Sequence, residues 1–356
     1  MKIAVYSICK NEIDQVDGYM SHLDALGLKP YILDHSTDGT TEKLRARGAI
    51  IDTTPIEDWW WDRGKNAAMD LVDKPVDFCV NIDLDERLSP DFWKIVDKVR
   101  SGTKLVQHLY KPEGGKERMR YDWRLHARHG ARWVGPVHEY LECLGEPKLQ
   151  LIEELLITHW PPPHKNHVPV ETVLRAVKAF PDDIRIKALC GRELFFSDRI
   201  DEAIDQFRDF LAGDSDNELD VCYAHRMLGK CYDRIKLPNV ALHHYQIAAT
   251  FQSREALVDL AYAYILRHKY QESYAAAVRA LNIADGQYLP NSDPDAWSWK
   301  PHELISVALY YCGHYDLAAQ AAATALKTAT GKYAERLTAS LETMREAADE
   351  AAKKKA

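Results

Sequence analysis

The chain has 356 residues, of which 46% are hydrophobic, and its 54 Asp and Glu outnumber its 46 Lys and Arg. This length and apolar fraction are enough for two domains with separate cores, and the net charge of −8 argues against broad, non-specific binding of nucleic acid. The seven cysteines lack the paired spacing of a zinc site, which favours free thiols in a reducing compartment. No stretch is long and apolar enough to span a membrane, so we expect a cytoplasmic protein.

Strands and helices are expected to alternate at the start of the chain. Short apolar runs that stop at polar residues predict strands, and the segments between them have helical spacing. The expected strands cover residues 2–8, 30–33 and 49–52, and the expected helices cover about 14–26, 37–47 and 63–72. This alternation indicates a doubly wound α/β domain.

The next apolar run, residues 78–82, ends in three acids, Asp83, Asp85 and Glu86. Open α/β sheets bind ligands at the carboxyl ends of their strands, where these acids would lie. Asp83 and Asp85 have the period-2 spacing that directs two side chains to the same side. A hard divalent cation, and through it a diphosphate, would satisfy both carboxylates. The alternative is a solvated acidic loop, or a helix that begins at Asp91.

The stretch from these acids to a triple proline predicts one helix and several strands. We expect the helix over residues 91–99 and strands over 104–110, 122–128, 131–134 and 152–157. A polar loop with two glycines, residues 111–116, could form a mobile flap. The last strand leads to His159, just before Pro161, Pro162 and Pro163. Since no helix or central strand continues through three prolines, we expect a domain boundary there.

Six short motifs, taken together and in this order, resemble a known family. They lie at residues 8–12, 33–40, 63–66, 83–86 and 135–139 and at His159. The first part of the chain resembles a GT-A glycosyltransferase of the family 2 type, in the branch that carries tetratricopeptide repeats. The resemblance implies an α/β catalytic domain with a Rossmann-like mixed sheet, followed by an all-α repeat domain. The corresponding ranges are residues 1–160 for the catalytic domain, 161–169 for a proline-rich linker and 170–356 for the repeats.

The resemblance also implies roles for individual residues. It assigns Mn²⁺ or Mg²⁺ to Asp83, Asp85 and His159. It assigns the nucleotide sugar, expected to be a UDP-sugar, to seven residues: Asn11, Glu12, Asp34, Arg63, Lys65, Asn66 and Asp83. In this assignment Asp34 meets the base, and Arg63 and Lys65 meet phosphate. Two alternatives remain open, because Asp34 could instead belong to a helix cap and a lone histidine such as His159 is often structural.

The chemistry is assigned to the motif that ends in His138 and Glu139. An inverting sugar transfer needs a base that takes the proton of the acceptor. By the resemblance, Glu139 falls where the family keeps an acid of this kind, and His138 is the alternative base. The competing interpretation is a structural ion pair of Glu139 with a nearby arginine: Arg124, Arg128 or Arg132.

Beyond the triple proline the pattern changes to paired helices. Small and aromatic residues recur at positions typical of tetratricopeptide repeats, such as Gly191 with Phe207 and Gly229 with Tyr245. Four equivalent positions are separated by 38, 32 and 45 residues, against about 34 for regular repeats: Ala203, Ala241, Ser273 and Ala318. The array is therefore degenerate, and its longest interval holds an insertion, residues 285–301, that could cover the concave face or contact a partner.

The leading hypothesis is a metal-dependent hexosyltransferase that moves a sugar from a UDP-sugar to a macromolecular acceptor: a protein, a glycan or a modified nucleic acid. The repeats would dock the acceptor or build a homo-oligomer. One alternative is transfer to hydroxymethylated DNA bases, with a run of arginines along the phosphate backbone: Arg118, Arg120, Arg124, Arg128 and Arg132. The other alternative is an inactive scaffold that only binds a nucleotide or a partner protein.

Overall fold

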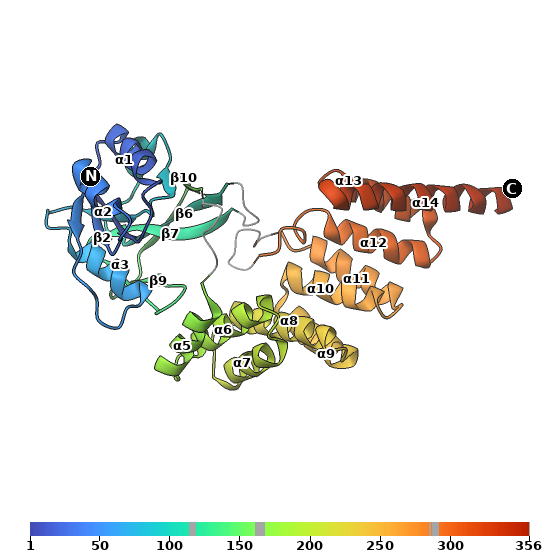
Figure 1. Cartoon of the computed structure of the whole chain (residues 1–356). Helices are drawn as coiled ribbons and strands as arrows, with labels where there is room; N and C mark the ends of the chain where they lie inside the picture. The colour runs from blue at the N-terminus through green and yellow to red at the C-terminus, as the bar shows by residue number, and fades with distance from the viewer. Residues whose placement is uncertain (114–118, 161–167, 285, 287–291, 356) are drawn as a thin grey trace. The chain divides into compact units, whose positions relative to one another are not determined.

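The computed structural model describes residues 1–113, 119–160, 168–284, 286 and 292–355 (Figure 1). The chain divides into two compact units, Met1–Val168 and Pro169–Ala356. The first unit is mixed α/β and the second consists of helices. Most of the predicted linker, residues 161–169, lies outside the described residues. No helix in the described part of the chain combines the length and the apolar character needed to cross a membrane.

The first unit is built on an eight-stranded mixed sheet with the strand order β3-β2-β1-β4-β7-β6-β10-β5. Its strands are β1 (Ile3–Cys9), β2 (Pro30–Asp34), β3 (Ile50–Asp52), β4 (Phe78–Asn81), β5 (Glu86–Leu88), β6 (Leu105–Pro112), β7 (Arg120–Ala127) and β10 (Leu149–His159). A separate antiparallel pair is formed by β8 (Ala131–Val134) and β9 (Tyr140–Cys143).

The direction of the strands decides which residues meet at an edge of this sheet. Strands β1, β2, β3 and β4 are parallel to one another. Strand β7 is antiparallel to both β4 and β6, and β6 is parallel to β10. Strand β10 therefore runs in the same direction as β4. As a result, the carboxyl ends of β1, β2, β4 and β10 all lie at one edge.

Two hydrophobic cores lie on opposite faces of the sheet. Alternate residues of β1 enter them, Ile3 and Val5 the first and Ala4 and Tyr6 the second, as the period of a strand requires. Helices α1, α2 and α4 contribute to the first core, and α3 with the β8–β9 pair contributes to the second. The bounds of these helices are α1 (Val16–Ala25), α2 (Thr40–Ala46), α3 (Trp61–Asp70) and α4 (Phe92–Val96).

The structure confirms the predicted alternation of strands and helices and adds two short strands, β5 and β9. Both are too short for an alternating pattern to show in the sequence. Strand β5 forms because Glu86–Leu88 pairs with the end of β10, where His159 lies opposite Glu86. The helix expected at residues 91–99 is the shorter α4. Of the expected flap, residues 114–116 lie outside the described part of the chain.

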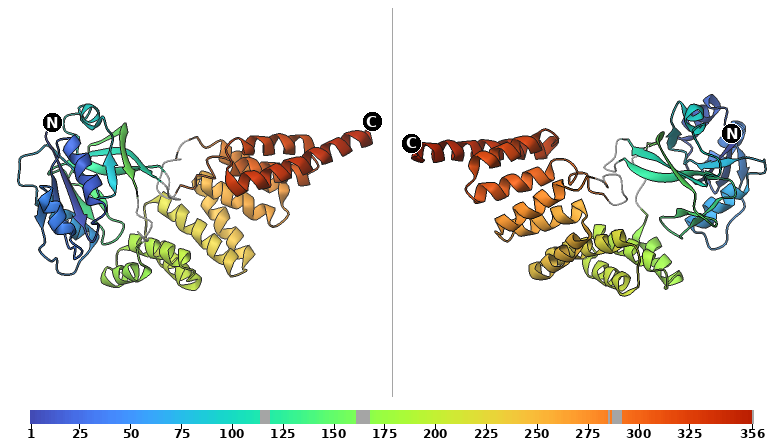
Figure 2. Two further views of the ribbon diagram at one scale, coloured as in Figure 1. Left: turned by 45° about the horizontal axis from the view of Figure 1, so that its top comes forward. Right: turned by 180° about the vertical axis from the view of Figure 1, so that it is seen from behind.

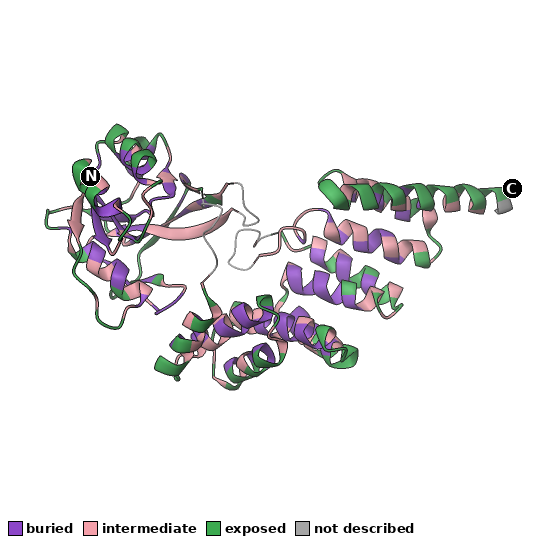
Figure 3. Ribbon diagram, viewed as in Figure 1, coloured by how far each residue is buried: buried purple, intermediate pink, exposed green. Residues whose placement is uncertain are grey.

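The second unit is an array of helices that pack in consecutive pairs: α6 with α7, α8 with α9, α10 with α11, and α12 with α13 (Figure 2). The helices are α5 (Val170–Ala179), α6 (Ile184–Phe196), α7 (Ile200–Ala212), α8 (Glu218–Arg234), α9 (Pro238–Ala248), α10 (Arg254–Ile265), α11 (Tyr270–Leu281), α12 (Lys300–Tyr311), α13 (Tyr315–Leu326) and α14 (Gly331–Lys355). Helix α14 covers the last pair with Leu337, Leu341 and Met344, and much of its surface is exposed (Figure 3).

The turns inside the four helix pairs are alike. Each contains one residue with a left-handed backbone: Asp198, Lys236, His268 and Gly313, with φ between 56° and 81°. These turn residues are separated by 38, 32 and 45 residues, the same intervals that the sequence predicts for the repeats. The second unit is thus a degenerate tetratricopeptide-like array of four helix pairs.

The small and aromatic positions of the repeats pack against each other. A Cβ atom added at Gly191 would lie 3.0 Å from ring atoms of Phe207, and one added at Gly229 would overlap the ring of Tyr245. Phe207 is fully buried, and Tyr245 is 5% exposed. Glycine therefore lets the two helices of a pair approach closely, because any side chain would push the aromatic ring away.

We expect Gly229→Ala to destabilise the second unit by about 1–3 kcal/mol, because the added methyl group overpacks the α8–α9 contact. The loss should appear as a lower midpoint in thermal unfolding followed by circular dichroism. Gly191→Ala is the matched comparison, and its smaller overlap with Phe207 predicts a smaller loss. Equal stability of Gly229→Ala and the unchanged protein would contradict this packing argument.

A buried ion-pair network joins α8 to α10. The Asp259 carboxylate lies 2.8 Å from Arg226 Nε and 3.4 Å from Lys230 Nζ. Arg226 and Asp259 are only 5% and 8% exposed. Burial alone would raise the pKa of Asp259, but the charges of Lys230, Arg226 and Lys300 outweigh it and lower this pKa to about 2. The folded unit therefore favours the ionised carboxylate.

This network predicts a pH dependence of stability. Because the folded-state pKa of Asp259 is about 2 and its ordinary value is 3.8, Asp259 stabilises the fold above about pH 4. That contribution, on the order of 2 kcal/mol, should disappear as the pH falls from about 4 to 2. Denaturant unfolding across this range should show the loss. Asp259→Asn should be less stable at neutral pH, and its free energy of unfolding should depend less steeply on pH between about 4 and 2. An unchanged slope in the variant would show that other carboxyl groups cause it.

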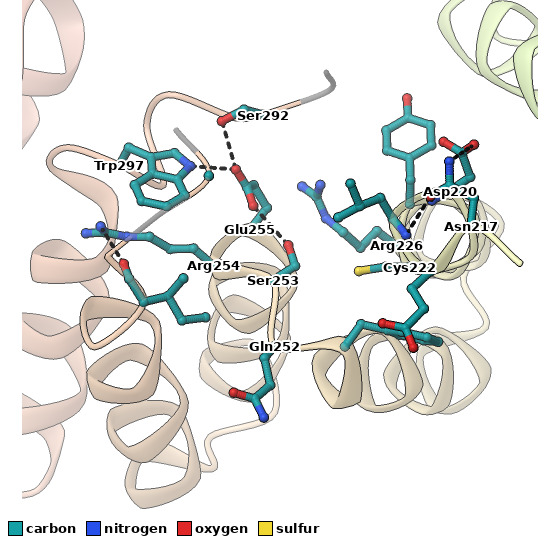
Figure 4. Close-up of a pocket in the computed structure, with 16 residues that line it drawn as sticks. Asn217, Asp220, Cys222, Arg226, Gln252, Ser253, Arg254, Glu255, Ser292 and Trp297 are labelled. Carbon is teal, nitrogen blue, oxygen red and sulfur yellow. Dashed lines mark hydrogen bonds between the residues drawn. The ribbon is translucent and has the colours of Figure 1, made fainter. Parts of the chain in front are cut away.

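The insertion between α11 and α12 is anchored on one buried acid (Figure 4). Glu255, at the start of α10, accepts hydrogen bonds from Trp297 Nε1 at 2.6 Å and Ser292 Oγ at 2.9 Å. The guanidinium of Arg254 lies 4.6 Å above the Trp297 ring. A cavity of about 260 Å³ lies beside this anchor, between the starts of α8 and α10. The described part of the insertion therefore packs on the array itself.

Candidate functional site

The shared edge of the sheet collects most of the residues that the sequence singles out. Asn11 and Glu12 follow β1, Asp34 ends β2, and Asp83 and Asp85 follow β4. His159 ends β10, which runs parallel to β4. Residues from four separate strands are therefore brought to the place where open α/β sheets bind ligands.

Asp85 and His159 are in direct contact at this edge. His159 Nε2 lies 3.1 Å from Asp85 Oδ2, and the Asp85 carboxylate is almost fully buried. The backbone reinforces this contact, because the N–H of Trp160 donates to the carbonyl of Asp85 and β5 pairs with β10 at Glu86 and His159. The structure thus brings together two of the three residues that the family resemblance assigns to the metal.

Asp83 and His159 each have a buried polar atom with no hydrogen-bond partner among the described residues, Asp83 Oδ1 and His159 Nδ1. Such atoms are costly to bury, and each needs a partner such as a water, an ion or a ligand. Within the described part of the chain, however, no three His, Cys, Asp or Glu side chains are assembled into a metal-binding group. Of the three predicted ligands, Asp85 and His159 thus contact each other, and Asp83 does not join them in a three-residue group.

A buried network supports the acidic turn, and the sequence analysis did not predict it. Glu86 is 1% exposed; its carboxylate accepts the N–H of Asp83 and the hydroxyl of Tyr110, both at 2.9 Å. Burial raises the pKa of Glu86, and the charge of Arg124, whose Nη2 lies 3.6 Å away, opposes that rise. Arg124 also donates to Asn81 and Asp122. The network fixes the backbone that carries Asp83.

The arginines that could follow a phosphate backbone make contacts within the first unit. Arg124 is held by the network, Arg128 donates to the carbonyl of Val72, and Arg132 pairs with Asp70. The guanidinium of Arg120 lies 4.3 Å above the ring of Tyr110. Arg118 lies outside the described residues. Four of the five arginines thus make internal contacts, so support for a phosphate-backbone site is lost.

Asp34 does not have the geometry predicted for contact with a nucleotide base. It is fully buried; one carboxylate oxygen accepts the N–H and hydroxyl of Ser36, and the other accepts the hydroxyl of Thr41 at 2.5 Å. Asp34 is not the helix cap that the sequence left open either, because the N-cap of α2 is Gly39; its carboxylate holds the turn that follows β2. Asn11 is exposed and accepts the N–H of Thr37, and the N–H of Glu12 donates to Thr40. Both thereby join the end of β1 to the loop after β2.

The residues predicted on α3 also have partners within the protein. Arg63 is 45% exposed in its side chain and pairs with Asp58 at 2.8 Å. The Asn66 side chain donates to the carbonyl of Trp133 and accepts its N–H, so it ties α3 to β8. Lys65 is buried, its Nζ lies 4.2 Å from the centre of the Trp133 ring, and it pairs with Glu139. The predicted phosphate contact of Lys65 is thus replaced by an ion pair.

Glu139 forms an ion pair, but with Lys65 and with none of the three arginines. Lys65 Nζ lies 2.6 Å from Glu139 Oε1, and the two side chains are 5% and 11% exposed. The neighbouring His138 has a left-handed backbone, with φ of 50°. A second acid missed in the sequence, Asp62, lies near this pair. Burial raises the pKa of Asp62, and the charge of Glu139 adds to the rise.

Comparisons with known proteins find similarity to solved structures of repeat proteins. No family model and no curated protein matches the chain. A tetratricopeptide repeat protein from Parabacteroides merdae is similar, with 15% identity over 50% of this chain and 66% of its own and a TM-score of 0.39. TTC0263, a thermophilic TPR protein of Thermus thermophilus, is 15% identical over 49% of this chain and 88% of its own, with a TM-score of 0.36. MamA is 18% identical over 44% of this chain and 85% of its own, with a TM-score of 0.37. The repeat architecture described above rests on its own helix pairs and turns.

Proposed function

We propose that the first unit is a metal-dependent glycosyltransferase that moves a sugar from a UDP-sugar to a macromolecular acceptor with inversion. The observation that carries the proposal is the contact of Asp85 with His159 at the shared carboxyl edge, together with the buried, unpartnered Oδ1 of Asp83 in the turn that carries Asp85. The six ordered motifs of the sequence add to it. The GT-A fold, the donor and the acceptor are all part of this proposal.

The residues present fit a hard divalent cation that binds together with a nucleotide. Mg²⁺ is usually held by one or two carboxylates and by substrate phosphates, so a site of this kind needs no complete protein cage. Asp85 Oδ2 and His159 Nε2, which lie 3.1 Å apart, would hold the ion together with Asp83 of the same turn, and the buried unpartnered Oδ1 of Asp83 supports this. The ion would neutralise the charge that develops on the leaving diphosphate.

The proposed base is Glu139, which would take the proton of the attacking acceptor hydroxyl. Its pairing with Lys65 keeps one carboxylate oxygen occupied, while the other oxygen has no hydrogen bond or ion pair described. Lys65 would thereby orient the carboxylate. Asn11 and Glu12, at the end of β1, remain proposed contacts of the nucleotide.

In this proposal, the repeat array recruits the acceptor or a second copy of the chain, because stacked helix pairs present an extended surface. A protein or glycan acceptor is favoured over hydroxymethylated DNA, since the arginines needed to follow a DNA backbone make internal contacts. An inactive scaffold remains the alternative that experiment has to exclude.

A screen of nucleotide sugars for nucleotide release tests the proposal directly. We expect slow hydrolysis of a UDP-sugar in Mn²⁺ and none in excess chelator, because water can replace the acceptor only while the diphosphate is bound with the ion. Asp85→Ala is the matched negative control. Binding of UDP without release from any donor would favour the inactive scaffold, and no binding of any nucleotide would overturn the assignment.

A further inference from the structure

The turns inside the third and fourth helix pairs carry a continuous cluster of aromatic rings. Helices α11 and α12 pack side by side, so the two turns are neighbours on the array (Figure 1). Tyr270, the first residue of α11, stacks on Tyr311, the last residue of α12, with centroids 4.5 Å apart and ring planes inclined by 10°. Edge-on ring contacts extend this stack to three more residues: His268, Tyr310 and Tyr315. The cluster therefore joins two turns into one surface.

Much of this surface is apolar and open to solvent. Tyr311 is 60% exposed, and two leucines beside the same turns, Leu266 and Leu317, are 53% and 52% exposed. Isolated apolar residues are common on protein surfaces, but these flank ring contacts that continue from one turn to the next. Tyrosine is enriched in protein interfaces, because it supplies a large contact area at a low cost in conformational entropy. We call this surface, formed by residues 266–270 and 310–317, the tyrosine edge.

The charges of the tyrosine edge are of both signs. Lys269 lies just before α11 and Asp316 lies at the start of α13; both are exposed, and neither makes an ion pair with another described residue. Arg267, in the same turn as Lys269, pairs with Asp233 at 3.7 Å. A strongly basic surface would favour an anionic membrane or a nucleic acid. An apolar edge with one unpaired charge of each sign favours a partner that carries the same two charges.

We propose that the tyrosine edge is a dimerisation surface, which packs against the tyrosine edge of a second copy of the chain. A two-fold axis that passes between the third and fourth turns would place the stack of Tyr270 on Tyr311 against the same stack of the second copy. The same axis would bring Lys269 toward Asp316 of the partner subunit, and this pairing would occur twice. The surface is thus complementary to itself in apolar character and in charge, as a two-fold dimer requires.

Dimerisation is one of the two roles of the repeat array in the proposed function, and it does not depend on sugar transfer. The tyrosine edge belongs to the second unit, which has hydrophobic cores of its own. The dimer should therefore form without metal or nucleotide, and Asp85→Ala should dimerise like the unchanged protein. Failure of the proposed transferase and failure of the proposed dimer are thus separate results.

Sedimentation equilibrium of the full chain over a range of concentrations tests the dimer. We expect a monomer–dimer equilibrium in the unchanged protein. Tyr311→Ser and Leu266→Ser should each raise the dimer Kd at least about 30-fold, because each removes an exposed apolar contact from both copies. Leu219→Ser is the matched control. Leu219, near the start of α8, is 55% exposed but lies outside the tyrosine edge, so its loss should leave the Kd unchanged.

Charge reversal tests the two-fold pairing. Lys269→Glu and Asp316→Lys should each weaken the dimer several-fold, because each places like charges opposite each other. The double variant, Lys269→Glu with Asp316→Lys, should bring the Kd back near that of the unchanged protein, which damage to the fold would not do. A double variant weaker than both single ones would overturn the proposal, as would a dimer that Tyr311→Ser and Leu266→Ser leave intact.

A chain that stays monomeric at every concentration would also overturn the proposal. Sedimentation of the monomer with vesicles that contain phosphatidylserine would then assign the tyrosine edge to a membrane surface instead.

Discussion

Asp85→Ala is expected to remove the metal dependence of UDP binding while leaving the protein folded. Asp85 is the acid that contacts His159, and these two residues are the core of the proposed metal and diphosphate site. Changes in the residues behind a metal ligand typically cost 10–100-fold in affinity, so loss of the ligand itself should cost more than about 100-fold. The measurement is calorimetry with UDP in Mn²⁺ and in excess chelator.

Two further variants sharpen this experiment. Asp97→Ala removes an exposed acid from the same unit and should leave UDP affinity unchanged. Asp85→Asn keeps the volume of the side chain. It should lower the UDP affinity in Mn²⁺ as far as Asp85→Ala does, because a neutral amide is a poor ligand for a hard cation. Equal UDP affinity in Mn²⁺ and in chelator for the unchanged protein would remove the metal from the proposal.

The ends of two strands could be predicted from the sequence because hydrophobic runs determine them, whereas only the family resemblance implied that the two ends meet at one edge. An apolar run that stops at acids identifies the end of β4, and the run that leads to His159 identifies the end of β10. Both ends fall at one edge once β6 and β10 run parallel to β4. In the repeats, intervals of 38, 32 and 45 residues reappear as the spacing of the left-handed turns.

The partners of individual polar side chains were harder to predict, since they depend on packing between distant segments. In the sequence, Lys65 is predicted to contact phosphate and Glu139 the acceptor. In the structure, α3 and the loop after β8 place Lys65 Nζ 2.6 Å from Glu139 Oε1. Arg124 and Glu86 meet only because β7 and β5 belong to the same sheet. The partner of Asp34, in contrast, is local. The N–H of Ser36, two residues later, donates to its carboxylate as in an Asx turn, so this contact could have been predicted from the sequence.

Glu139→Gln is expected to lower sugar-transfer turnover by about 10²–10⁴-fold while donor affinity stays close to normal. Proton removal in the transition state typically contributes a factor of this size, and glutamine keeps the shape of the side chain without its basicity. The substitution also leaves Lys65 buried without its charge partner. Breaking a buried pair in this way can cost about 3–5 kcal/mol, so turnover has to be compared at equal folded fraction.

Lys65→Met separates the two effects, because it breaks the same ion pair and leaves the Glu139 carboxylate in place. If Glu139 is the base, Lys65→Met should lose stability, yet lose far less turnover than Glu139→Gln. His138→Ala tests the other candidate, and a larger loss there than in Glu139→Gln would make His138 the base. If Lys65→Met and Glu139→Gln lose turnover equally at matched folded fraction, the ion pair is structural. The base would then have to be another acid, and Asp62 on α3 is the first candidate to test.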